Sequence, residues 1–415
     1  MSVHRRTLRI LIAVGLVAAV TATTGASVSA GPVAARTKDT GQADAIRQVV
    51  RQAMADQHMK AAIVSVNIDG QDVITEAFGD TIPGVPATTG MSFRNGAVAF
   101  AYLGTLLLRF VDDGTVRLDD TIDRWLPGLP DANKVTLLML ANQTAGYPDF
   151  EQDPAWRAAY YADPYHSWTY EERLAYIVDP AKRPFPPGTN WSYSHSNFMI
   201  LGEALARIAK QPLANLLQER VLKPMKLRNT VESPTSSMPS PFLHSFSAER
   251  APFFHVPAGT PFYEEETFWN TQWGTPMGAN ETSTIGDLVT TAIATGTGRL
   301  LSDASYHAMT DPNLLGFGHP DAACGSECFT QTYAYNFGIG VVRNGSWIKQ
   351  NPVLTGYAAV EAYLPSKKIA IAIVNTYAQE YFQDPANLPA NPSNALYEKI
   401  GALLAPNDAP PPFVH

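Results

Sequence analysis

Apolar residues recur with two different periods near the N-terminal end of the chain. Between Ile46 and Met54 they follow the 3.6-residue spacing of an amphipathic helix. The segments Ile63 to Ile68 and Val73 to Phe78 are short and rich in β-branched residues, and Asp69-Gly70 between them is a turn signal. We therefore expect a helix followed by a two-stranded hairpin.

The C-terminal end repeats this combination in the opposite order. Phe337 to Val342, Ala358 to Leu364 and Ile369 to Asn375 predict three strands, and Asn394 to Leu404 predicts a helix. Between the two ends the pattern is mainly helical, with proline and glycine between the helices. The expected middle helices span residues 97–112, 136–142, 169–178, 196–209 and 213–221.

This order of elements favours an α+β fold, with one antiparallel sheet built from both ends, flanking terminal helices and an inserted, mainly helical lobe. The sheet lobe is expected to comprise about residues 41–95 and 330–404, and the helical lobe about residues 96–329. A ligand is expected in a cleft between the lobes.

The first thirty residues have the features of an export signal. Arg5, Arg6 and Arg9 precede an apolar run from Ile10 to Val20, and small residues lead to a cleavage point near Ala30. The run is too short for a membrane-spanning helix, so we expect a secreted or extracytoplasmic protein without a transmembrane anchor. The mature domain is then residues 31–404, and the proline-rich tail at 405–415 is expected to be unpacked.

Charge narrows the range of partners. After removal of the signal, 27 basic and 38 acidic residues remain, which gives a net charge of −11. Such an acidic surface disfavours nucleic acid and anionic lipid. We expect no cofactor.

Three residues separate the two cysteines, Cys324 and Cys328. In an oxidising compartment this spacing favours a small disulfide-closed loop, with two free thiols as the alternative. Only His319 is close enough in sequence to join them as a ligand, so we expect no metal site.

Several short motifs follow one another along the chain in a defined order. They are Leu106 to Asp120, Trp125-Leu126-Pro127, Thr144-Ala145-Gly146-Tyr147-Pro148, Pro187-Gly188-Thr189, Tyr193-Ser194-His195, Val221 to Met225, Ser283-Thr284 and Gly356-Tyr357. In this order they resemble the serine β-lactamase and D-alanyl-D-alanine carboxypeptidase (penicillin-binding) superfamily, in its class C and esterase-like branch. The resemblance covers nearly the whole mature length.

The resemblance implies a nucleophilic serine at a helix N-terminus and a lysine one turn later, which takes part in proton transfer. It places these two residues at Ala97 and Phe100. A methyl group cannot attack a carbonyl, and a benzyl group can neither accept a proton nor carry positive charge. Acyl-serine chemistry is therefore absent at this position.

The family's other two motifs are also altered. In the Tyr-x-Asn motif, Tyr193 is present and His195 replaces the asparagine. The third motif, Lys-Thr-Gly or His-x-Gly, falls on Gln350-Asn351-Pro352. The resemblance implies that the backbone N–H groups of Ala97 and Val353 form an oxyanion hole. Backbone donors do not depend on the identity of the side chain, so this feature can persist.

Two further features leave alternatives open. Ser92 and Ser194 lie near the altered motifs, but neither has a lysine one helical turn away, as a displaced nucleophile would need. The segment 241–273 is rich in aromatic residues; it is either a loop that offers stacking surfaces over the cleft or an irregular segment packed against the helical lobe.

We therefore predict an exported pseudoenzyme that retains a cleft for a cell-wall peptide or a small acyl ligand, with Tyr193, His195, Gln350, Pro352 and Val353 in that cleft. One alternative is an active serine hydrolase, of the esterase, β-lactamase or D-alanyl-D-alanine carboxypeptidase type, that uses a non-standard nucleophile. The other is a structural scaffold whose cleft is filled by Phe100 and its neighbours.

Overall fold

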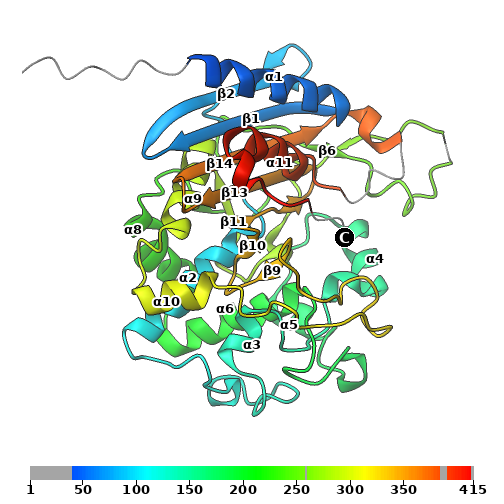
Figure 1. The fold of residues 1–415 in the computed structure, drawn as a ribbon. Helices are drawn as coiled ribbons and strands as arrows, with labels where there is room; N and C mark the ends of the chain where they lie inside the picture. The colour runs from blue at the N-terminus through cyan, green and yellow to red at the C-terminus, as the bar shows by residue number, and fades with distance from the viewer. Residues whose placement is uncertain (1–39, 258, 384–389, 413–415) are drawn as a thin grey trace, which may run out of the picture. The chain divides into compact units, whose positions relative to one another are not determined.

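Strands from both ends of the chain form one nine-stranded sheet, in which β1 pairs with β14 (Figure 1). The computed structural model describes residues 40–257, 259–383 and 390–412. The predicted export signal at residues 1–30 lies outside the described residues.

The sheet order is β3-β2-β1-β14-β13-β11-β10-β9, and β12 pairs with β13 beside β11. Every pairing along this path is antiparallel. The strands are β1 (Met59–Ile68), β2 (Gln71–Ile82), β3 (Val85–Pro86), β9 (Asn336–Phe337), β10 (Val342–Asn344), β11 (Trp347–Gln350), β12 (Val353–Leu354), β13 (Tyr357–Leu364) and β14 (Ile369–Tyr377).

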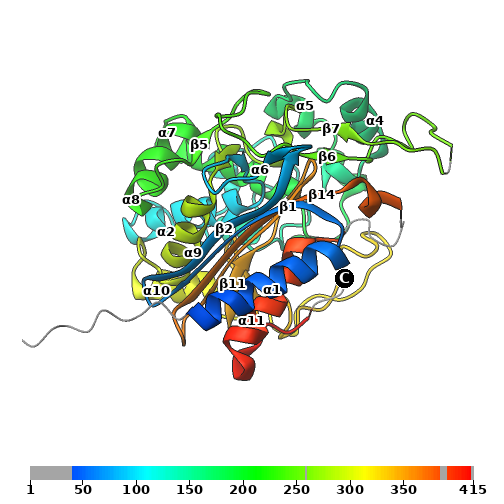
Figure 2. The ribbon, with the colours of Figure 1, turned by 90° about the horizontal axis from the view of Figure 1, so that it is seen from above.

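Alternation along each strand gives the sheet two apolar faces. On β1, Ala62 and Val64 pack into a core shared with α1 (Thr40–Asp56) and α11 (Pro392–Leu404). Ala61 and Ile63 belong to the larger core on the opposite face. Figure 2 shows α1 and α11 together on one side of the sheet and α2 and α9 on the other. Because β13 and β14 are covered on both faces, all their residues are buried.

The segment between β3 and β9 carries most of the helices. They are α2 (Val98–Asp112), α3 (Leu137–Ala141), α4 (Pro154–Ala162), α5 (Tyr170–Leu174), α6 (His195–Ala209), α7 (Leu213–Leu217), α8 (Lys223–Met225), α9 (Ile285–Gly296) and α10 (Asp303–Thr310), with a π-helical turn at Gln218–Leu222. Its strands are β4 (Phe93–Arg94), β5 (Val231–Glu232), β6 (Phe246–Ser247), β7 (Glu264–Glu265) and β8 (Glu281–Ser283). The predicted α+β class, with terminal helices on an antiparallel sheet and an inserted helical part, is confirmed. The exact lobe boundaries stay a prediction.

The prediction of an unpacked proline-rich tail is wrong for its described part, which ends at residue 412. Pro410 is buried, and its ring lies over Gly401 of α11, where a Cβ atom would come within 2.5 Å of it. The carbonyls of Asp408 and Pro411 accept hydrogen bonds from Trp347 and Asn344, each at 2.8 Å. Proline lacks an N–H, but it has a carbonyl and an apolar ring, and this tail uses both.

Among the described residues, no helix combines the length and hydrophobicity needed to cross a membrane.

Candidate functional site

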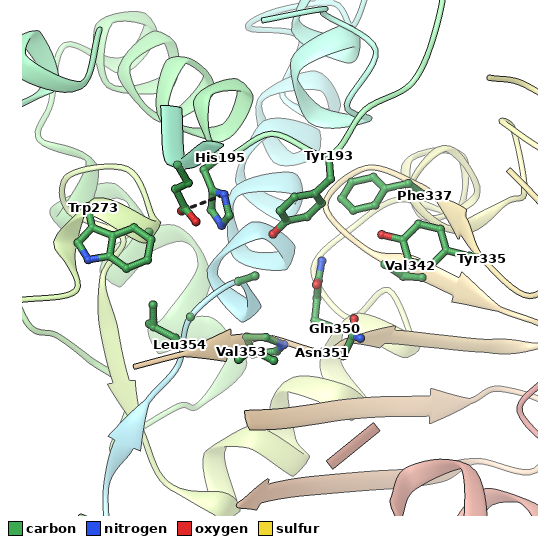
Figure 3. Close-up of a pocket in the computed structure, with 15 residues that line it drawn as sticks. Tyr193, His195, Trp273, Tyr335, Phe337, Val342, Gln350, Asn351, Val353 and Leu354 are labelled. Carbon is green, nitrogen blue, oxygen red and sulfur yellow. Dashed lines mark ion pairs between the residues drawn. The ribbon is translucent and has the colours of Figure 1, made fainter. Parts of the chain in front are cut away.

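A cavity of about 210 Å³ lies where the N-terminus of α2, the segment leading into α6, the turn around Trp273 and strands β11 and β12 meet (Figure 3). It is smaller than the roughly 300 to 1,000 Å³ of pockets that enclose drug-sized ligands. It is lined by Gly96, Ala97, Glu151, Tyr193, His195, Trp273, Gly274, Tyr335, Phe337, Val342, Gln350, Asn351, Pro352, Val353 and Leu354. The site residues predicted from sequence, except Phe100, therefore converge on one small cavity.

Ala97 and Phe100 have different surroundings although they are one helical turn apart. Ala97 is the N-cap residue of α2, is half-buried and borders the cavity. Phe100 is completely buried, and its ring stacks on Phe198 of α6 with centroids 3.9 Å apart and planes at 4°. The rings of Tyr193 and His195 lie 6.0 Å from it. The position that the resemblance gives to an ammonium group is thus part of the apolar core beneath the cavity.

The turn before α2 brings the third motif close to the helix. Gly96 has φ of +54°, and a Cβ atom there would come within 2.8 Å of the Cβ atom of Pro352. Glycine is favoured in this left-handed conformation because it has no side chain to clash. The ring of Pro352 fills the space beside Gly96.

Gln350 and Pro352 have structural contacts of their own. The Gln350 side-chain amide donates a 2.6 Å hydrogen bond to the Gly340 carbonyl. The neighbouring Lys349 projects from the opposite face of β11, where Nζ lies 2.5 Å from Oδ1 of Asn394 in α11. Burial lowers the pKa of Lys349 to about 8. Lys349 therefore cannot replace the missing lysine of the third motif, because successive side chains of a strand point to opposite faces.

The backbone of Val353 faces the cavity. Val353 lies opposite Ala358 on β13, and the Ala359 N–H donates to the Pro352 carbonyl at 2.9 Å. Hydrogen-bonded and non-hydrogen-bonded pairs alternate in an antiparallel ladder, so the Val353–Ala358 pair is of the second kind and the Val353 N–H points away from β13. The Ala97 N–H lies at the start of α2, where helical N–H groups have no intrahelical acceptor. Both groups border the same cavity.

Tyr193 projects into the cavity beside His195 (Figure 3). Burial raises the pKa of its hydroxyl well above 10, and the nearby Tyr335 and Glu151 add to the effect. The hydroxyl therefore remains protonated at neutral pH. It can donate a hydrogen bond to a ligand, but it is not activated as a base.

Two carboxylates hold the imidazole of His195. Its Nδ1 lies 3.0 Å from Oδ2 of Asp149 and 2.9 Å from Oε1 of Glu151. Burial by itself would lower the pKa of His195, but the two carboxylates outweigh burial and raise the pKa well above 6.5. Burial raises the pKa of Glu151 to about 7, against the opposing effect of His195. Without another cation, His195 is an imidazolium at neutral pH.

Asp149 and Glu151 were not identified from the sequence. They flank Phe150 in a short 3-10 turn (Phe150–Gln152) that directly follows the Thr144 to Pro148 motif. Asp149 caps this turn, because its Oδ1 accepts the Glu151 N–H at 3.2 Å. The signal available in the sequence was a pair of acids immediately after a recognised motif, but His195 is 46 residues away.

The serines considered as displaced nucleophiles are engaged or buried. The Ser92 hydroxyl donates to the carbonyls of Pro239 and Pro241, at 2.7 and 3.0 Å. Ser194 is only 1% exposed and its hydroxyl has no hydrogen-bond partner within the described chain. Among the described residues that line the cavity there is no serine, threonine, cysteine or lysine.

The aromatic segment 241–273 contributes one aromatic ring to the cavity lining, that of Trp273. Trp269 is buried against Tyr160, with ring centroids 5.8 Å apart, and Phe246 stacks on Tyr263 at 5.0 Å. Most of these rings therefore pack within the segment or against the helical part. Elsewhere, Cys324 and Cys328 form a disulfide, with Cα atoms 5.6 Å apart.

Solved structures with the same fold cover most of this chain. A D-amino acid amidase from Ochrobactrum anthropi, complexed with D-phenylalanine, aligns with a TM-score of 0.70 and 20% identity over 88% of this chain and 99% of its own. The octameric penicillin-binding protein homologue from Pyrococcus abyssi aligns with a TM-score of 0.64 and 16% identity, over 90% of this chain and 78% of its own.

Curated relatives match a shorter stretch. The D-alanyl-D-alanine-carboxypeptidase/endopeptidase AmpH of Escherichia coli is 28% identical over 177 residues, which are 41% of this chain and 45% of that protein. Penicillin-binding protein 4 of Amycolatopsis lactamdurans is 28% identical over 194 residues, which are 44% of this chain and 47% of that protein. The chain thus spans about half the length of these relatives. The family model for beta-lactamase matches residues 46–391, so this chain belongs to the beta-lactamase family.

Proposed function

We propose that this chain is an exported, non-acylating member of the beta-lactamase family that binds the end of a cell-wall peptide, or a small acyl ligand, in the cavity at the N-terminus of α2. One observation carries the proposal. The cavity is open and bordered by the methyl group of Ala97, whereas the benzyl group of Phe100 is buried beneath it against Phe198. A cavity of this kind can hold a ligand without supplying a nucleophile.

The size and lining of the cavity support a ligand of one terminal residue or one acyl group. Its volume of about 210 Å³ is below that of drug-sized pockets. The N–H groups of Ala97 and Val353 are suited to a carbonyl or carboxylate oxygen. The Tyr193 hydroxyl and the Trp273 ring offer a hydrogen bond and an apolar contact. The relatives named D-alanyl-D-alanine carboxypeptidases favour a cell-wall peptide as the source of that group. Residues 1–30, with the features of an export signal, support a location where such peptides occur.

The first experiment asks whether the chain is acylated. The purified protein is incubated with a fluorescent penicillin and with a fluorophosphonate, beside a catalytically competent D-alanyl-D-alanine carboxypeptidase as positive control. We expect labelling of the control only. Covalent labelling of this chain that survives replacement of Tyr193 and is traced to a serine would refute the proposal and establish a working hydrolase.

The second experiment asks whether the cavity binds a ligand. An N-acylated peptide ending in D-alanyl-D-alanine is titrated into the protein and into two variants at the cavity wall. Ala97→Trp fills the cavity and should abolish binding, whereas Ala97→Ser adds one oxygen atom and should preserve it. If the wild type releases no heat of binding, the protein is a scaffold that does not bind this peptide. If the wild type and Ala97→Trp release equal heat, the peptide binds outside this cavity.

A further inference from the structure

A cluster of three possible metal ligands lies at the edge of the cavity. Nδ1 of His195, a carboxylate oxygen of Asp149 and a carboxylate oxygen of Glu151 all lie within 4.8 Å of one another. The distances from Nδ1 to the two oxygens are 3.0 and 2.9 Å. Two ligands bound to one zinc ion at about 2.1 Å stand roughly 3.0 to 3.4 Å apart, so these spacings are close to those of a coordinated set.

The donors at this place are of the kinds that divalent transition-metal ions bind. Asp149 and Glu151 offer carboxylate oxygens beside the Nδ1 atom of His195. Imidazole and carboxylate groups are both common ligands of such ions.

The nearby arginines do not neutralise these carboxylates through described hydrogen bonds. Arg157 donates to the backbone carbonyl of Glu151 and to the Gln152 side chain, at 3.1 and 3.2 Å. Arg173 is buried and donates to three carbonyls, those of Gln272, Trp273 and Thr275. Both guanidinium groups therefore interact with Glu151 only electrostatically, although Nη2 of Arg173 has no hydrogen-bond partner among the described residues.

The cluster is positioned by its surroundings and is open on one side. The side chains of Asp149, Glu151 and His195 are 6%, 18% and 20% exposed, so all three are largely enclosed. The Glu151 N–H holds Oδ1 of Asp149, which leaves Oδ2 directed at His195. Glu151 and His195 also line the cavity, where Figure 3 shows His195 between Trp273 and Tyr193. Three protein ligands beside an open cavity match the arrangement of zinc sites that keep a position for water or a ligand.

From these observations we infer that Asp149, Glu151 and His195 form a binding site for a divalent transition-metal ion, with Zn²⁺ as the reference ion. The imidazole and carboxylate donors suit zinc among the common ions. An ion there would present an open coordination position to the cavity. It would also restore a positive charge in a site where Phe100 and Gln350 replace the cationic groups implied by the family resemblance. The inference does not depend on the proposed peptide binding, because ion binding is measured without any peptide.

The test is a calorimetric titration of Zn²⁺ into the full chain, freed of metal by a chelator and kept oxidised so that Cys324 and Cys328 remain bonded. We expect one ion per chain. His195→Asn, which installs the residue implied by the family resemblance, should weaken binding by about 100-fold or more. The double variant Asp149→Asn with Glu151→Gln should have the same effect and preserves the shape of both side chains. Thermal unfolding without metal shows that each variant is folded.

A matched control distinguishes the site from casual surface binding. His166 and Glu172 form an exposed pair at 3.1 Å, and His166→Ala should leave the stoichiometry and affinity unchanged. Absence of one-to-one binding by the wild type would overturn the inference. Binding that persists unchanged in both His195→Asn and the carboxylate double variant would overturn it as well. A zinc anomalous signal between these three side chains in a crystal would support it directly.

Discussion

The ring of Phe100 lies parallel to that of Phe198, with centroids 3.9 Å apart and an interplanar angle of 4°. Both rings are completely buried, and each comes from a helix that borders the site, α2 and α6. Stacked aromatic pairs contribute about 0.5 to 1.5 kcal/mol beyond the area that they bury. The position implied for a catalytic amine has therefore become a contact that joins two helices.

Restoring the two missing side chains should not restore the chemistry. In Ala97→Ser with Phe100→Lys, the introduced ammonium would lie in an apolar site near His195, whose pKa is raised and which is itself cationic. We expect no acylation by a fluorescent penicillin and a clear loss of stability in urea unfolding, because an unpaired buried charge is costly.

Ala97→Ser alone is the control for that double variant and should unfold like the wild type. Substantial ester hydrolysis by the double variant would contradict the expectation. It would also show that Gln350 and Pro352 matter less than the third motif suggests.

Removing the Phe100 ring should destabilise the fold. Phe100→Ala leaves a cavity between α2 and α6 and is expected to lower the free energy of unfolding by about 3 to 5 kcal/mol. Phe100→Leu keeps most of the volume and should cost less. The measurement is urea unfolding followed by intrinsic fluorescence. A loss below about 1 kcal/mol for Phe100→Ala would mean that the site collapses or that the ring is not tightly packed.

The fold was predictable because its signals are local. The hairpin around Asp69-Gly70 and the C-terminal strands each show their period within a few residues, and the order of elements restricts their pairing. The substitutions at Ala97 and Phe100 were also readable, because both positions belong to one helical turn with recognisable flanks. Gln350 and Pro352 were assigned to the third motif by their spacing, because the family's third motif begins six residues before the glycine that is Gly356 in this chain.

The parts that sequence reasoning missed depend on contacts between distant segments. Asp149 meets His195 across 46 residues, and no period or spacing connects them. Lys349 and Gln350 are adjacent, yet only the strand pairing shows that Lys349 faces α11. The tail was misjudged for the same reason. Its prolines are typical of an unpacked terminus, whereas the surface left open by Gly401 receives Pro410.

The loop closed by Cys324 and Cys328 should add modest stability. The cysteines are four residues apart in sequence, and a loop this short restricts the unfolded chain by about 2 kcal/mol at most. We expect Cys324→Ala with Cys328→Ala to lower stability by no more than that, as measured by urea unfolding. A reductant should destabilise the wild type to the same extent and leave the variant unchanged. A loss above about 4 kcal/mol would show that the disulfide also supports packing near Glu327.

The last prediction concerns Glu361, which is 1% exposed in the middle of β13 with Oε1 unpaired within the described chain. Burial raises its pKa from 4.5 to about 8. Between these values the folded protein keeps a proton that the unfolded chain releases, so the free energy of unfolding falls as the pH rises. The stabilisation is complete below about pH 4.5, and the loss by pH 8 reaches up to about 5 kcal/mol.

Glu361→Gln keeps the shape of the neutral acid but does not titrate, so it should remove this loss. Urea unfolding of both proteins should give similar stabilities near pH 5 and a more stable variant near pH 8, and the other titrating groups cancel in the difference. Parallel pH profiles for the two proteins would show that the Glu361 carboxyl group is ionised in the folded state, in which case a cation or water must reach the centre of the sheet.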